Sequence, residues 1–292
     1  MEAGHEVLLV VTRPDQPAGR HMHMAAPPVV DVTRRLGLSL AQPEKLGVDE
    51  FVSRLRALAP EVAVVVAFGR MISPRVLRVP RLGFVNLHPS LLPRYRGPSP
   101  IESAILAGDA VTGVTTMLLD EGMDTGPILL QRETRINPRE HSPEVEARLA
   151  HLGAHLVVET LAGLASGTVI ATPQDNSTAT VTVKLERRMG RVDWQLTAQE
   201  LSNRCRAFDP WPGVFTSFRG GRLKIHGLEV GESILGDEAP GTVLGVSPAG
   251  IAVRAGKGTV AVVTEVQREG KRRMPADAFI IGERVAPGEH IH

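Results

Sequence analysis

The chain has 292 residues, 42% of them hydrophobic and 22% charged, so it can bury a substantial core and has the composition of a soluble globular protein. Its formal net charge of +1 excludes a basic field over the whole surface, and its single cysteine, Cys205, excludes an internal disulfide and a multi-cysteine metal site. The longest purely apolar run, residues 62–68, is too short to cross a bilayer, and no signal-like segment is seen, so we expect a cytoplasmic protein.

The first part of the chain predicts strands alternating with helices. Apolar, β-branched runs predict strands, and apolar residues at helical spacing predict helices. The predicted strands are 7–15, 61–69, 83–88, 112–120 and 126–133, and the predicted helices are 29–38, 50–60, 74–79, 99–108 and 142–167. This alternation predicts an α/β domain with a doubly wound, mostly parallel sheet.

After residue 167 the pattern changes. A linker runs into a helix within 191–208, and short strands broken by Gly and Pro follow, which is typical of a small OB-like β-barrel. We therefore expect three parts: an α/β domain over 1–183, a linker over 184–206 and a barrel over 207–292. Residues 184–224 hold nine basic and four acidic residues, which fits a solvated linker and a phosphate-binding surface equally well.

Two polar side chains end the predicted strand 83–88. Asn86 and His88 are two residues apart, so they share one face of the strand. In a parallel sheet, ligands bind outside the carboxyl ends of the strands. An amide and an imidazole in that position can stabilise an oxyanion or move a proton, although such residues are also often structural.

The loop "DEGMDTGPI" at residues 120–128 carries three acids, Asp120, Glu121 and Asp124. Taken alone, it fits a solvated turn. An acid at the rim of the same crevice could instead orient His88 or accept protons through water.

Residues 86–129, from "NLHPSLLP" to "DEGMDTGPIL", closely resemble the folate-dependent formyltransferases. The resemblance implies a Rossmann-like catalytic domain that transfers a formyl group from 10-formyltetrahydrofolate to an amine without a metal ion. It assigns catalytic roles to Asn86, His88 and Asp124. It assigns folate contact to four consecutive residues, Ser90, Leu91, Leu92 and Pro93.

Further stretches at 12–20, 40–46, 64–77 and 193–218 resemble the branch of this family that formylates initiator methionyl-tRNA for translation initiation. The implied partners are tRNA and folate, with no membrane, and we expect a monomer. The candidate tRNA contacts are Arg20, Arg206, Lys271, Arg272 and Arg273. The turn that carries the last three fits a solvated hairpin tip equally well.

The sequence departs from the family at its start, where we expect a further strand, a Gly-Thr-Pro turn and a helix. Without that strand, the strands at 7–15 and 61–69 should each present an unpaired edge. The loop at 19–30 is also less basic than the family's. Two other readings stay open: a formyltransferase acting on a sugar-nucleotide amine, and a non-catalytic protein that binds tRNA or folate.

Overall fold

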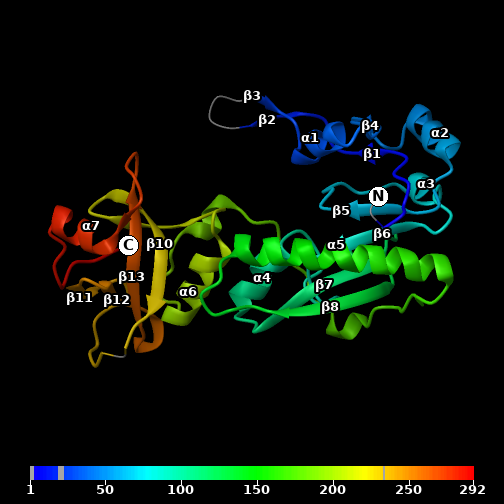
Figure 1. The fold of residues 1–292 in the computed structure, drawn as a ribbon. Helices are drawn as coiled ribbons and strands as arrows, with labels where there is room; N and C mark the ends of the chain where they lie inside the picture. The colour runs from blue at the N-terminus through cyan, green and yellow to red at the C-terminus, as the bar shows by residue number, and fades with distance from the viewer. Residues whose placement is uncertain (1–2, 19–22, 233) are drawn as a thin grey trace. The chain divides into compact units, whose positions relative to one another are not determined.

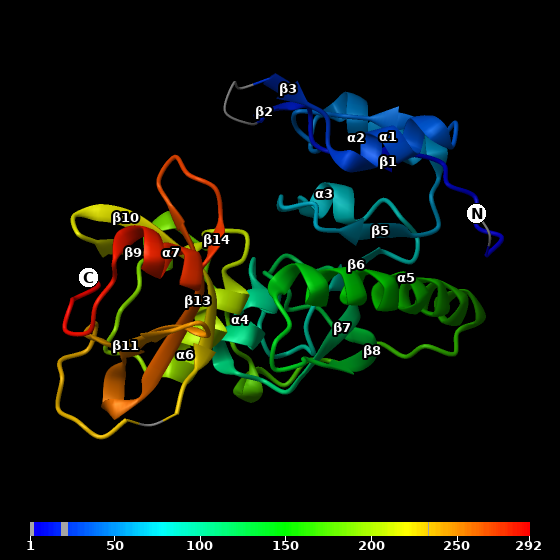
Figure 2. The same cartoon turned by 60° about the vertical axis from the view of Figure 1, so that its left-hand side comes forward.

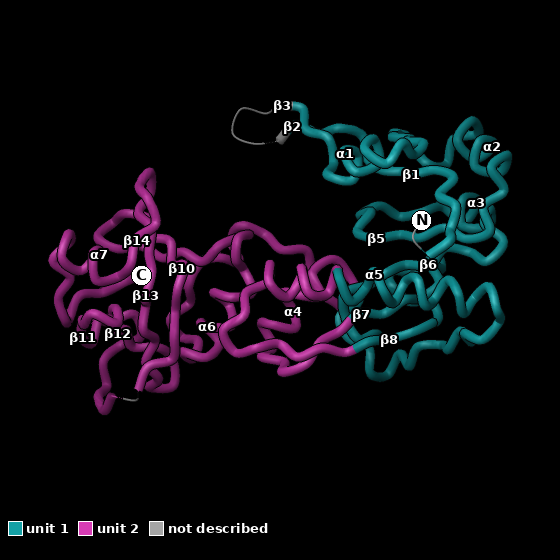
Figure 3. Tube along the Cα trace, in the orientation of Figure 1, with its two compact units in different colours: residues 1–96, 114–132, 151–180 teal, residues 97–113, 133–150, 181–292 magenta. Residues whose placement is uncertain are grey.

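The computed structural model describes residues 3–18, 23–232 and 234–292. The chain forms two compact units, shown in different colours in Figure 3. Unit 1 comprises residues 1–96, 114–132 and 151–180, and unit 2 comprises residues 97–113, 133–150 and 181–292. Because the units interleave along the chain, they do not test the predicted boundaries at 183 and 206, which stay predictions.

The strands of the N-terminal part form separate sheets (Figure 1). Strand β1 pairs in parallel with β4, strand β2 pairs antiparallel with β3, and a four-stranded sheet has the order β5-β6-β7-β8. The strands are β1 (Val10–Val11), β2 (Gln16–Ala18), β3 (His23–Ala25), β4 (Leu40–Ala41), β5 (Ala63–Val66), β6 (Phe84–His88), β7 (Val111–Leu118) and β8 (Ile128–Arg135).

The predicted α/β architecture is confirmed, but its strands lie in separate sheets, and the four-stranded sheet contains both parallel and antiparallel pairs. Strand β6 is parallel to β5 and antiparallel to β7. Among the described strands, β1 pairs only with β4 and β5 only with β6, so each has one unpaired edge, as the sequence predicted. One face of β5 is exposed, with Val64 43% and Val66 57% exposed, while Ala63 and Val65 on the other face pack against the buried cluster.

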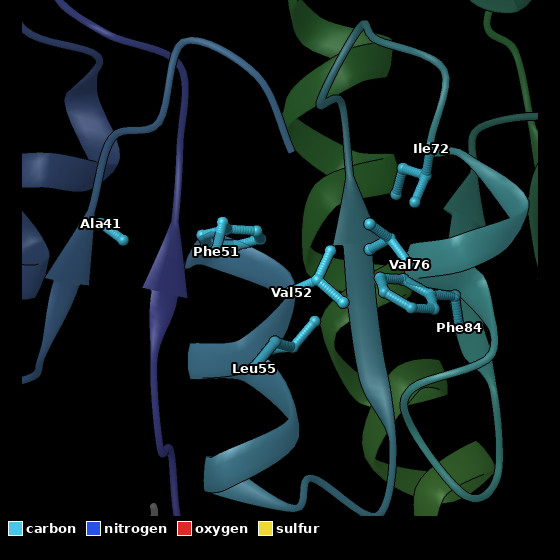
Figure 4. Packing of buried hydrophobic residues seen from close by; sticks show 7 residues of the cluster. All are labelled: Ala41, Phe51, Val52, Leu55, Ile72, Val76 and Phe84. Atoms are coloured by element: carbon cyan, nitrogen blue, oxygen red, sulfur yellow. The ribbon is translucent and has the colours of Figure 1, made fainter. Parts of the chain in front are cut away.

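The predicted helices of this part are all present, with shorter bounds. They are α1 (Pro28–Arg35), α2 (Asp49–Leu58), α3 (Pro74–Leu77), α4 (Pro100–Ala107) and α5 (Ser142–Ser166). Val52 and Leu55 point from α2 toward Val76 of α3 and Phe84 of β6, which together belong to one buried cluster (Figure 4). Burying each such side chain stabilises the fold by about 1.5–3 kcal/mol.

Helix α5 lies alongside β6, β7 and β8 in both views (Figures 1 and 2). By length and composition alone it could cross a membrane. However, Leu149, Gly153, Leu156 and Thr160 are buried and recur at helical spacing, which is the pattern of a helix that covers a sheet. A Cβ on Gly153 would lie 2.4 Å from the nearest side-chain carbon of Leu87, so glycine lets α5 approach β6 closely.

Unit 2 is built on an antiparallel sheet of the order β11-β12-β13-β10-β9, with β14 paired to β13. Its strands are β9 (Val214–Phe218), β10 (Gly221–Val230), β11 (Val243–Ser247), β12 (Gly250–Arg254), β13 (Val260–Arg268) and β14 (Met274–Pro275). This matches the predicted run of short C-terminal strands.

Two helices accompany this sheet, α6 (Ala198–Ala207) and α7 (Ala276–Glu283), with short 3-10 turns at Arg187–Gly190 and Gly256–Gly258. A further 3-10 turn, Asn176–Thr178, belongs to unit 1. The sequence predicted α6 but not α7. Helix α6 begins with a capping box, since the Thr197 hydroxyl accepts from the Glu200 N–H while the Glu200 carboxylate accepts from the Thr197 N–H at 2.7 Å. The Ser202 hydroxyl then donates to the Leu228 carbonyl at 3.1 Å, which ties α6 to β10.

Cys205, on the buried face of α6, should be unreactive in the folded protein. Burial raises the pKa of its thiol to about 12, so almost none of it is thiolate at pH 8. We expect a thiol reagent such as DTNB to modify the native protein on the order of a thousandfold more slowly than the urea-unfolded chain. Rapid labelling of the native protein, at a rate near that of the unfolded chain, would contradict the burial of this thiol.

Candidate active site

Strand β6 presents Asn86 and His88 on one face, because side chains alternate along an extended strand. Asn86 is paired with Val65 of β5 and Met117 of β7, and His88 with Thr115 of β7. Ladders on both sides therefore fix the backbone at Asn86, and the ladder with β7 fixes it at His88. The predicted common face of Asn86 and His88 follows directly from this geometry.

Both nitrogens of the His88 ring face protein oxygens. Its Nε2 lies 2.9 Å from the carbonyl oxygen of Tyr95, and its Nδ1 lies 3.6 Å from Oδ2 of Asp124. A carbonyl can only accept a hydrogen bond, so Nε2 carries a proton and donates a hydrogen bond to the Tyr95 carbonyl. In the neutral ring the Nδ1 lone pair then faces the Asp124 carboxylate, whereas a charged ring would donate toward both oxygens.

The acidic loop that brings Asp124 to His88 is shaped by Asp120. The Asp120 carboxylate accepts hydrogen bonds from the Gly122 N–H at 3.0 Å and the Thr125 hydroxyl at 2.7 Å. Asp124 itself has a φ of 53°, in the left-handed region. The structure thus separates the roles that the sequence left open: Asp120 closes the turn, Asp124 faces the imidazole, and Glu121 is exposed.

The turn after β6 is held by hydrogen bonds to a buried threonine of β7. The Thr115 hydroxyl donates to the Ser90 carbonyl at 2.6 Å and accepts from the Leu92 N–H at 3.1 Å. The side chains of Ser90 and Leu92 are buried, whereas those of Leu91 and Pro93 are partly exposed. The predicted folate contacts stay predictions, with Leu91 and Pro93 the two whose side chains a ligand can reach.

The candidate tRNA contacts divide into three groups. Arg20 lies outside the described residues. Lys271, Arg272 and Arg273 are exposed between β13 and β14, and Arg273 forms an ion pair with Glu265.

The prediction that Arg206 contacts tRNA is corrected by the structure, because this residue is only 7% exposed. Its guanidinium donates to the Glu140 carbonyl at 3.1 Å and the Asn203 side-chain oxygen at 2.7 Å, both within unit 2. These bonds make Arg206 a structural residue and not a surface contact for phosphate. A run of basic residues in the sequence does not show which of them are buried and which are exposed.

Cavity size does not identify this site. A cavity of about 610 Å³ lies beside β4 and the start of α2, lined by Leu40, Phe51 and Arg54 among others, and none of the predicted site residues lines it. Within the described ranges, no group of three or more His, Cys, Asp or Glu side chains could hold a metal ion. The site is therefore located by the chemistry of Asn86, His88 and Asp124.

Sequence reasoning missed two residues that hold this site, Thr115 and Gln174. Gln174 donates to the backbone of the acidic loop, 50 residues away, at the Asp124 carbonyl. A threonine inside a strand and a glutamine in an irregular segment carry no sequence signal of such a role.

Comparison with protein families matches residues 1–161 to the formyl transferase model and residues 184–284 to the formyl transferase C-terminal domain. The chain is 46% identical over 285 residues to the methionyl-tRNA formyltransferase of Koribacter versatilis, covering 97% of this chain and 90% of that protein. It is 45% identical over 288 residues to the methionyl-tRNA formyltransferase of Acidobacterium capsulatum, covering 98% and 92%.

Solved structures show the same fold at low identity. The sugar 3N-formyl transferase WlaRD superposes with a TM-score of 0.65 at 16% identity, covering 90% of this chain and 88% of that one. HypX from Aquifex aeolicus in complex with tetrahydrofolic acid superposes with a TM-score of 0.60 at 20% identity, covering 86% of this chain and 43% of that one. At these identities the likeness concerns the fold alone.

Gly126 should be required for the shape of the acidic loop. A Cβ there would lie 1.9 Å from the carbonyl oxygen of Leu118, and this backbone atom belongs to β7 and cannot turn aside. We expect Gly126→Ala to destabilise the protein by about 1–3 kcal/mol in urea unfolding. Gly245→Ala is the control, since its Cβ would meet nothing within 4 Å, and equal midpoints for the two variants would contradict this close packing of the loop against β7.

Proposed function

The chain belongs to the methionyl-tRNA formyltransferases, and from this premise we propose that its β6 site transfers a formyl group from 10-formyltetrahydrofolate to the α-amino group of initiator methionyl-tRNA. Identity of 46% across 97% of the chain supports this substrate pair. The observation that carries the proposal is that Asn86 and His88 share one face at the end of β6, with Nδ1 of His88 3.6 Å from Oδ2 of Asp124.

The reaction makes one C–N bond and breaks another. The neutral amine of the methionyl group attacks the formyl carbon, negative charge gathers on the formyl oxygen, and the bond to the donor nitrogen then breaks. The amine loses a proton and the donor nitrogen gains one. We assign two donors to the developing oxyanion, the Asn86 amide and the Nε2–H of His88, which would be shared between the oxyanion and the Tyr95 carbonyl.

The other nitrogen of His88 is the atom we assign to proton transfer. In the neutral ring its Nδ1 has a lone pair, and the Asp124 carboxylate lies beside it. A proton taken up at Nδ1 produces an imidazolium held between the Asp124 carboxylate and the Tyr95 carbonyl. Return of this proton to the departing nitrogen completes the cycle, and this sequence needs no metal ion.

Folate contact is assigned to the turn after β6, where Leu91 and Pro93 are the partly exposed apolar residues beside the catalytic strand. We further propose that the enzyme works as a monomer in the cytoplasm, where tRNA is charged, without a membrane. The exposed Lys271 and Arg272 are candidates for contact with the tRNA backbone.

A sugar amine is the second candidate acceptor, because the sugar N-formyltransferase WlaRD shares the fold over 90% of this chain. The methionyl-tRNA relatives are far more similar in sequence, at 43–46% identity against 16%. A transfer assay that offers both acceptors, together with 10-formyltetrahydrofolate, tests the assignment. Formylation of a sugar-nucleotide amine but not of methionyl-tRNA would overturn it, and formylation of neither would favour a binding protein.

Loss of either proposed oxyanion donor should remove most of the activity. We expect Asn86→Ala and His88→Ala each to lower turnover by about a hundredfold or more, since one such donor is worth about 2.7–4 kcal/mol of barrier. Steady-state formyl transfer, measured alongside thermal unfolding, checks this. Turnover near that of the parent protein in a folded variant would remove that residue from the mechanism.

Binding of charged tRNA should depend on salt more steeply than binding of folate. Each phosphate neutralised by a basic side chain adds about 0.7–0.9 to the slope of log affinity against log salt. Replacing Lys271 and Arg272 with Ala should lower the slope for tRNA and leave folate affinity unchanged. Titrations at several salt concentrations measure both slopes, and a flat dependence for tRNA would favour the sugar-nucleotide acceptor.

A further inference from the structure

One irregular segment, residues 172–180, touches both loops that surround His88; we call it the crossing segment. Its first residue, Thr172, exchanges backbone hydrogen bonds with Ile128 at the start of β8, both at 2.8 Å. Its last residue, Thr180, reaches the turn after β6. All of these contacts lie within unit 1.

In the middle of the crossing segment, Gln174 holds the backbone of the acidic loop. Its Nε2 donates to the Asp124 carbonyl at 2.9 Å and to the Gly126 carbonyl at 2.7 Å. Both N–H donors of the amide are thereby used on the two sides of Thr125. The peptide groups that follow Asp124 and Gly126 are consequently fixed in direction.

The opposite side of the same amide is fixed by a buried arginine. Oε1 of Gln174 accepts from Nε of Arg96 at 3.0 Å and from its Nη2 at 2.8 Å. Arg96 is only 7% exposed, and its Nη2 also donates to the Asn176 side-chain oxygen at 2.8 Å. Because a guanidinium can only donate, the Gln174 amide has one allowed orientation, with its N–H groups toward the acidic loop.

Thr180 supports the other partner of His88. The Tyr95 N–H donates to the Thr180 hydroxyl at 2.7 Å, and the Arg96 N–H donates to the Thr180 carbonyl at 2.9 Å. These bonds hold Tyr95, whose carbonyl receives the Nε2–H of His88. The crossing segment is thus hydrogen-bonded to the backbone of both residues whose oxygens face the His88 ring nitrogens.

We propose that Gln174, oriented by Arg96, is a positioning residue that aims the Asp124 carboxylate at Nδ1 of His88. The Gln174 amide fixes the peptide group that follows Asp124, and thereby the backbone from which the Asp124 carboxylate lies 3.6 Å from Nδ1 of His88. The inference deepens the proposed function and rests on it where activity is the readout.

Two substitutions distinguish the hydrogen bonds that Gln174 donates to the acidic loop from those that it accepts from Arg96. Gln174→Ala removes both, whereas Gln174→Glu keeps an acceptor for Arg96 but sets a carboxylate oxygen against the two carbonyls. We expect each to lower kcat on the order of tenfold to a hundredfold, with KM for tRNA changed less than about threefold, because misplacement of a reacting group acts on the chemical step.

The matched control is Thr178→Ala, on the same segment. The Thr178 hydroxyl donates to the Asp175 carbonyl, a contact within the crossing segment itself. Its kcat should stay within about twofold of the parent protein. If Gln174→Ala fails to fold, Gln174→Glu carries the test, since it retains the bond to Arg96.

A double-mutant cycle with Asp124→Asn distinguishes positioning from general structural support. If Gln174 acts through Asp124, then Gln174→Ala should lower kcat less than about twofold once Asp124 is already Asn. Multiplicative losses would overturn the proposal. So would a kcat for Gln174→Ala equal to that of the parent protein.

Hydrogen exchange of the free protein gives a readout independent of activity. Peptides that cover residues 120–126 should exchange faster in Gln174→Ala than in the parent protein or in Thr178→Ala. Unchanged exchange in that loop would overturn the proposal even in an active enzyme. A parent protein that formylates no acceptor would instead contradict the proposed function, while the exchange result would still decide the role of Gln174.

Discussion

The commitment of both His88 ring nitrogens to protein oxygens is the constraint on which the rest of the site depends. Nε2 donates to the Tyr95 carbonyl, and Nδ1 faces the Asp124 carboxylate at 3.6 Å. The two partners come from different loops, so the ring is oriented only when both loops are in place. With one proton on Nε2, a second proton would be gained and lost at Nδ1, which is the role that we propose for His88 in formyl transfer.

The fold holds His88 and its two partners in place through hydrogen bonds and close packing around strand β6. Strand β6 lies between β5 and β7, its last residue His88 is paired with Thr115 of β7, and the Thr115 hydroxyl holds the turn that follows. Gly126 lets the acidic loop pass against the Leu118 carbonyl, and Gly153 lets α5 approach the back of β6 at Leu87. These close approaches leave little freedom to the groups around His88.

Local pattern was enough to predict the alternation of strands and helices, the common face of Asn86 and His88, and the position of Asp124 in an acidic turn. It was not enough for Gln174 or Thr180, because their partners are distant in sequence and a polar residue in an irregular segment has no periodicity. Arg206 was misassigned since burial depends on tertiary packing. The unpaired edges of β1 and β5 were predicted from the family resemblance and not from periodicity, which does not specify strand pairing.

The most direct test of this account is the tautomer of His88, read from nitrogen–proton correlations of the imidazole ring by NMR in the free enzyme. At a pH where the ring is neutral, the account predicts that the proton resides on Nε2, because that nitrogen faces a carbonyl at 2.9 Å. A neutral ring protonated on Nδ1 would contradict it, since Nε2 would then present a lone pair to the Tyr95 oxygen.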